Sequence, residues 1–75
     1  MVKIRPVEQI VRRYVKHSLW AFLDGEQNLN WIAGIIRESG MLKGELQEVF
    51  DEVQSYGDVT RYQEIVKVCK DQNWL

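Results

Sequence analysis

The sequence has few of the residues that cross-link small proteins. It contains one cysteine, Cys69, and one histidine, His17, in 75 residues. A single cysteine excludes a disulfide within the chain, and two soft ligands are too few for a structural zinc site. We therefore expect no metal and no cofactor. One unpaired cysteine also favours a reducing compartment, so we expect a cytoplasmic protein.

Long apolar runs and a strong net charge are also missing. The net charge is −1, which provides no general attraction to nucleic acid or to a membrane surface. No apolar stretch approaches the roughly 20 residues that a membrane-spanning helix needs, and none follows the basic start as in a signal peptide. We expect a soluble protein with no membrane partner.

The sequence also lacks a catalytic pattern. His17 has no nucleophile near it except Ser18, which points elsewhere on the same predicted helix. Cys69 falls on the apolar face of its helix, where a cysteine behaves as a small core residue rather than as a reactive thiol. The glycines follow no phosphate-binding pattern. We therefore predict no catalytic residues and no enzymatic activity.

Helical periodicity is the main positive signal. Pro6 is the only proline, and it stands in a predicted first turn, where helices tolerate proline. Apolar residues recur at three- and four-residue spacing over residues 6–23, 29–39, 42–56 and 60–72, and no segment alternates with a period of two. We predict an all-α fold, a small compact bundle of about four helices. It forms one domain over residues 1–75, with consecutive helices packed roughly antiparallel.

Start and stop signals flank these stretches. Asn28 is a candidate N-cap for the second helix, and Gly40 supplies its left-handed stop. Thr60 and Gln63 match a capping box at the start of the fourth helix, although Asp58 is a rival cap.

The apolar spacing also predicts which residues face the core. In the first helix the inward stripe is Val7, Ile10, Val11, Tyr14, Ser18 and Phe22, with Val15 and Leu19 on its flank. In the third it is Leu42, Leu46, Val49, Phe50, Val53 and Tyr56, and in the fourth Val59, Tyr62, Ile65, Val66 and Cys69. The second helix is apolar over more than half its circumference, which places it centrally.

The small net charge conceals two opposed poles. From residue 1 to 20 there is a net charge of +4, from one acidic residue, Glu8, and five basic residues: Lys3, Arg5, Arg12, Arg13 and Lys16. From residue 41 to 58 there is a net charge of −4, from one basic residue, Lys43, and five acidic residues: Glu45, Glu48, Asp51, Glu52 and Asp58.

The basic pole has a defined place on the first helix. Arg12, Arg13 and Lys16 fall opposite the predicted apolar stripe, and Trp20 falls on the same polar face one turn beyond Lys16. A tryptophan among cations can stack on a base, hold a guanidinium or anchor a protein interface. Alternatively, another helix or the chain ends cover it as part of the core. Trp31 is expected in the core, and Trp74 could seal the core or protrude.

The acidic pole has three interpretations. Glu45, Glu48 and Glu52 share one side of the third helix, with Asp51 beside them. The favoured one is a solvated helix face. A cation site is disfavoured because the loop and mixed ligands of a calcium hand are missing. The third is an electrostatic docking surface for a basic partner.

The segment from Trp31 to Val53 superficially resembles a helix-turn-helix, with Gly40 as the turn glycine. Ile36 stands where such motifs usually have a small residue. The would-be recognition helix also carries four carboxylates, which would repel phosphates. We therefore reject base recognition in the major groove by this helix.

These features predict a non-enzymatic interaction or regulatory module that docks another protein through its charged helix faces. That partner could also be a second copy, forming a homodimer. The alternative is a nucleic-acid-binding protein that contacts phosphates through the basic first helix. The predicted partner-binding residues are Arg12, Arg13, Lys16 and Trp20 on one surface, and Glu45, Glu48, Asp51 and Glu52 on the other.

Overall fold

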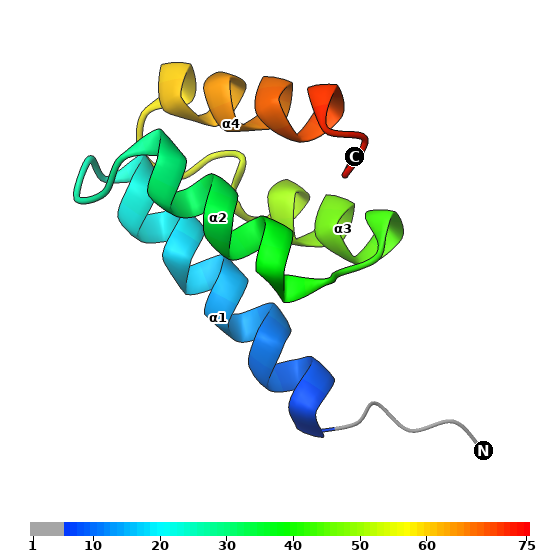
Figure 1. Cartoon of the computed structure of the whole chain (residues 1–75). Helices are drawn as coiled ribbons and strands as arrows, with labels where there is room; N and C mark the ends of the chain where they lie inside the picture. The colour runs from blue at the N-terminus through cyan, green and yellow to red at the C-terminus, as the bar shows by residue number, and fades with distance from the viewer. Residues whose placement is uncertain (1–5) are drawn as a thin grey trace.

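Four helices form the part of the chain that the computed structural model describes, residues 6–75 (Figure 1). They are α1 (Pro6–Leu23), α2 (Leu29–Ser39), α3 (Lys43–Val53) and α4 (Val59–Asp71). The predicted all-α bundle is confirmed, and the described residues contain no strand. The bounds of α1 and α2 are as predicted. α3 is shorter than predicted at both ends, and α4 begins and ends one residue early.

Local capping explains both ends of α2 and the start of α4. Asn28 Oδ1 accepts a hydrogen bond from the Trp31 amide at 2.8 Å, which confirms the predicted N-cap of α2. Gly40 ends α2 with φ 67°, a left-handed conformation that glycine adopts without steric cost. Asp58, rather than Thr60, caps α4, because its carboxylate accepts a hydrogen bond from the Thr60 amide at 2.8 Å.

α1 is the central helix, and it packs against α2, α3 and α4, while α2 also packs against α4. Consecutive helices do not all pack together: no Cα of α3 lies within 8 Å of a Cα of α2 or α4. The predicted antiparallel packing of neighbours is therefore wrong for these pairs, because the short α2–α3 connection carries the chain to another side of α1. A helix-turn-helix needs its two helices in contact, so this geometry also opposes that motif.

The core differs in part from the predicted stripes. Its fully buried members come from all four helices and include Val15, Leu19, Phe22, Leu23, Ile32, Leu46, Val49, Phe50, Val53, Ile65 and Cys69. On α1 the inward face is centred on Val15 and Leu19, which were expected on the flank, because α3 packs against that flank. Ile10 and Tyr14 are consequently exposed, and the side chain of Val7 lies outside the described part.

Three further residues that were expected to face inward are exposed: Leu42, Tyr56 and Val59. Leu42 precedes α3, Tyr56 follows it, and Val59 begins α4, so each stands where its helix reaches the edge of the core. Trp31 and Trp74 are half-buried and pack against the core. The Trp74 amide donates to the Cys69 carbonyl at 2.7 Å, so the C-terminal residues fold back over the end of α4.

α1 extends beyond the other helices. Figure 1 shows its N-terminal turns projecting past the ends of α2 and α3. With 18 residues, α1 is longer than α2 and α3, each of 11 residues, so its partners cannot cover it all. Among the described residues no helix is long and apolar enough to cross a membrane.

Candidate interaction surface

The two charge poles meet within the chain. Arg12 Nη2 lies 2.9 Å from Glu48 Oε1 and 3.4 Å from Glu52 Oε2, and Lys16 Nζ lies 3.0 Å from Glu52 Oε1. The cations belong to α1 and the carboxylates to α3, and the two residues of each helix are four positions apart, so they lie on the same side of that helix. These four residues, Arg12, Lys16, Glu48 and Glu52, form the α1–α3 ion-pair cluster.

The cluster shifts the pKa of Arg12 and the pKa of Glu52. The hydrogen bond to Glu48 raises the pKa of Arg12. The hydrogen bond from Lys16 lowers the pKa of Glu52, and the neighbouring charges act in the same direction. All four side chains remain partly open to water, where such pairs contribute little stability each. The cluster therefore orients α3 on α1 more than it stabilises the fold.

Trp20 lies beside this cluster, where Lys16 Nζ is 5.4 Å from its ring centre. Its ring meets His17 edge-on at 4.8 Å and Tyr56 at 5.7 Å, and the half-buried side chain packs against the core. Of the interpretations of Trp20, the one in which other parts of the chain cover it as part of the core therefore fits these contacts best.

The predicted site residues do not form two separate surfaces. The structure brings Arg12, Lys16 and Trp20 together with Glu48 and Glu52. It does not bring Arg13, Glu45 or Asp51 into the cluster: all three are exposed, and Asp51 accepts a hydrogen bond from Gln47 on its own helix at 3.0 Å. Whether any of these residues binds a partner remains a prediction, but four of the eight, Arg12, Lys16, Glu48 and Glu52, are already engaged in ion pairs within the chain.

The outer face of α1 is a surface that sequence reasoning missed. Ile10 is 64% exposed and Tyr14 57% exposed, although both are large and mainly apolar. His17 and Ala21 continue the same line at three- and four-residue intervals and are exposed and half-buried respectively. This spacing is that of a coiled-coil seam. We call Ile10, Tyr14, His17 and Ala21 the α1 seam.

A shallow hollow adjoins the seam between α1 and α2. It is lined by Val11, Tyr14, Ile35, Glu38 and Ser39. Tyr14 therefore belongs to both the seam and the hollow. Together they form an apolar surface on the side of α1 that α3 leaves free.

The length of the first helix was the sequence feature that could have indicated this exposed surface. An 18-residue helix beside two of 11 residues leaves turns that its partners cannot cover. Ile10 and Tyr14 were instead included in the predicted inward stripe, because their spacing continues the apolar pattern of the first helix.

Residues 6–75, which the structure describes, do not assemble a recognisable catalytic group. Cys69 is fully buried, and burial raises the pKa of its thiol to about 12, which keeps it protonated. His17 is exposed on α1 and contacts Trp20. Among the described residues, no three histidine, cysteine or acidic side chains come together as metal ligands.

Comparison with protein families, with curated proteins and with solved structures found no match to this chain.

Proposed function

We propose that this protein is a non-enzymatic interaction module that binds a helix of another protein on the α1 seam. The observation that carries the proposal is the exposure of Ile10 and Tyr14 on a helix that buries Val15 and Leu19 in the core on another side. Complete burial of such a side chain is worth about 1.5–3 kcal/mol, so two adjacent ones can anchor a partner.

The spacing of the seam supports a helical partner. Residues 10, 14, 17 and 21 form a line on one side of α1, apolar except for His17, which a second helix can follow along its length. The hollow beside Tyr14 would accept a side chain from that helix. Exposed Arg13 flanks the line, so an acidic residue on the partner would add charge complementarity.

The charged faces support docking less well than the seam. A partner that used Arg12, Lys16, Glu48 or Glu52 would have to displace ion pairs of 2.9–3.4 Å that already exist. Arg13, Glu45 and Asp51 are outside the cluster and could form a polar rim around a docked partner. The buried free thiol is compatible with a reducing compartment, and we place the protein in the cytoplasm on that basis.

Affinity capture with matched variants tests the proposal. The double variant Ile10→Lys, Tyr14→Lys adds charge to the seam, and Leu42→Lys adds charge to another exposed apolar residue, 71% exposed, just before α3. We expect a specific partner to bind the wild type and Leu42→Lys equally, and the seam variant at least about tenfold more weakly. Equal binding to all three, measured with the purified partner, would contradict the proposal.

A homodimer and a nucleic-acid complex are the two alternatives, and each has a direct test. Sedimentation over a concentration range detects self-association, and a dimer lost in the seam variant would make a second copy the partner. Binding to duplex and single-stranded nucleic acid at low salt tests phosphate contact through α1, because such binding is strongest there. We expect no binding to nucleic acid, because Arg12 and Lys16 already form ion pairs with Glu48 and Glu52.

A further inference from the structure

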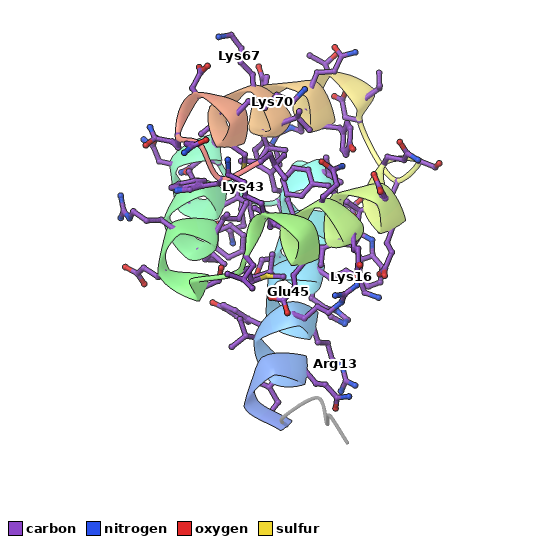
Figure 2. All side chains as sticks on the ribbon, turned by 90° about the vertical axis from the view of Figure 1, so that its right-hand side faces the viewer. Arg13, Lys16, Lys43, Glu45, Lys67 and Lys70 are labelled. Carbon is purple, nitrogen blue, oxygen red and sulfur yellow. The ribbon has the colours of Figure 1, made fainter. Side chains whose placement is uncertain are left out.

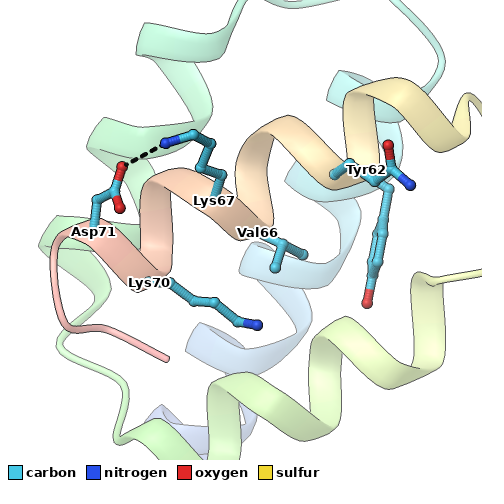
Figure 3. A pocket seen from close by; sticks show the side chains of 6 residues that line it. Tyr62, Val66, Lys67, Lys70 and Asp71 are labelled. Atoms are coloured by element: carbon cyan, nitrogen blue, oxygen red, sulfur yellow. Dashed lines mark hydrogen bonds and ion pairs between the residues drawn. The ribbon is translucent and has the colours of Figure 1, made fainter.

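A second surface, along α4, is separate from the α1 seam. The backbones of α3 and α4 stay apart, and Tyr62 spans the gap. Its ring lies 6.0 Å from that of Phe50, and its hydroxyl donates to the Phe50 carbonyl at 3.4 Å. The packing leaves an open hollow of about 320 Å³ on α4, lined by Tyr62, Gln63, Val66, Lys67, Lys70 and Asp71 (Figure 3). We call it the α4 groove.

The floor of the groove is apolar. Tyr62 and Val66 are half-buried, and Val59, three residues before Tyr62 on the same face of α4, is 61% exposed. Figure 3 shows Tyr62, Val66 and Lys70 all directed toward the space between α4 and α3. Along α4 the groove therefore has an apolar part, at Tyr62 and Val66, followed by a basic end at Lys70.

The charge at one end of the groove is positive. Lys67 and Lys70 belong to the last turns of α4, and Lys43 reaches the same end, where its Nζ donates to Asn73 Oδ1 at 2.7 Å. In the view of Figure 2, Lys43 and Lys70 both lie well away from Arg13. One lining carboxylate, Asp71, opposes them, and it pairs with Lys67 at 3.3 Å.

The acidic residues of α3 do not neutralise this end. Glu45 is two residues from Lys43, which places it about 200° around the helix axis, away from the groove. Glu48 and Glu52 are paired with α1. Burial and then the charge of Asp51 raise the pKa of Tyr62, so Asp51 is close to that residue. Asp51 lies in the last turn of α3, whereas Lys43 begins the helix, so Asp51 is about 12 Å along α3 from the basic end.

We infer that the α4 groove binds an amphipathic helical segment of a partner protein that carries carboxylates at one end. Its apolar side chains would pack on Tyr62 and Val66, and its carboxylates would meet Lys70 and Lys43. From Val59 to Lys70 the face is about 16 Å long, the length of roughly three helical turns. A second copy does not supply such a segment, because the apolar residues of the acidic helix α3 are buried.

Designed peptides provide the probe. One 14-residue helical peptide has leucines at i, i+4, i+7 and i+11 with three glutamates at one end, and its control has lysines in place of the glutamates. Each is titrated into the isotope-labelled protein and followed by amide chemical shifts. We expect the glutamate peptide to cause saturable shifts at Tyr62, Val66 and Lys70, with an affinity at least about fivefold higher than that of the lysine peptide.

Variants separate the groove from the seam. Lys70→Glu should weaken binding of the glutamate peptide at least about fivefold. Arg37→Glu makes the same change of charge at an exposed residue of α2 and should leave that binding unchanged. Ile10→Lys should also leave it unchanged, so failure of the seam proposal would not imply failure of this one. Equal affinity of the two peptides, shifts centred on Ile10 and Tyr14, or no saturable shift at millimolar peptide would each overturn the inference.

Discussion

Single residues fix one end of the molecule more firmly than the other. The Asp58 amide donates to the Leu23 carbonyl at 3.2 Å, which ties the α3–α4 turn to the end of α1. Arg61 donates to the carbonyls of Phe22 at 2.9 Å and Gln27 at 3.1 Å. At the opposite end, the projecting turns of α1 have no comparable anchors among the described side chains. These hydrogen bonds therefore gather at the end of α1 that is away from Ile10 and Tyr14.

Gly57 is the residue on which this end depends. Its φ of 69° is left-handed, and a Cβ there would lie 2.7 Å from the Leu23 carbonyl oxygen and 2.8 Å from Leu23 Cβ. Gly57→Ala should lower the free energy of unfolding by about 2–4 kcal/mol. Gly34→Ala, in α2 with open space around it, should raise it by about 0.5–1 kcal/mol. Urea unfolding of both variants checks the pair, and similar destabilisation by both would contradict the geometry.

Cys69 should be inert in the folded protein. Its thiol is fully buried with a pKa of about 12, so almost no thiolate exists at neutral pH. A thiol reagent should therefore react with the native chain orders of magnitude more slowly than with the chain in guanidinium. Folding raises the pKa of this thiol, so ionisation of Cys69 should not affect the free energy of unfolding below the unfolded thiol's pKa of about 8.5. Above that pH the free energy of unfolding should fall, because the unfolded chain loses the thiol proton more readily than the folded chain. Rapid labelling of native protein at pH 7 would show that the thiol is accessible.

At the scale of elements, much of the fold could be predicted from local sequence. Pro6 begins α1, and Asn28 and Gly40 cap the two ends of α2. Each of these residues affects only the backbone within about one helical turn, so its effect can be predicted from local sequence. The direction in which α1 faces could not be predicted, because it depends on which side α3 occupies. Val15 and Leu19, and not Ile10 and Tyr14, became its buried residues for that reason.

The candidate site shows the same division. The charges of Arg12, Lys16, Glu48 and Glu52 could be identified from the sequence, but not their mutual pairing, because they are 36 to 40 residues apart. Contacts this distant depend on how helices pack. The α1 seam likewise became visible only once its partners were placed.

The pairing of α1 with α3 should depend on pH through Glu52. Its pKa is lowered by the hydrogen bond from Lys16, so the stabilisation is present above the ordinary glutamate pKa of about 4.3 and is lost as the pH falls through the lowered value. Glu52→Gln should show a shallower loss of stability between pH 5 and 3 than the wild type. Glu64→Gln, a change at an exposed residue of α4, is the control and should follow the wild type. Denaturant unfolding at each pH gives the comparison.

At the scale of the whole molecule, the described chain measures 40 × 22 × 20 Å, an elongated shape to which the projecting end of α1 contributes. The seam follows α1, and the α4 groove lies on a different helix with its basic end far from Arg13 (Figure 2). Two separate surfaces of different chemistry on one small bundle would suit a protein that holds two partners. The seam is the more apolar of the two and is the central claim.

Site-specific cross-linking tests that claim most directly. A photoreactive phenylalanine analogue is placed at Tyr14 in one protein and at exposed Glu64 of α4 in another, and both are irradiated with cell extract. We predict one defined adduct from position 14, reproduced with the purified partner, absent from position 64 and lost when Ile10→Lys is added. Equal adducts from both positions, or an adduct at position 14 that survives Ile10→Lys, would contradict docking on the α1 seam.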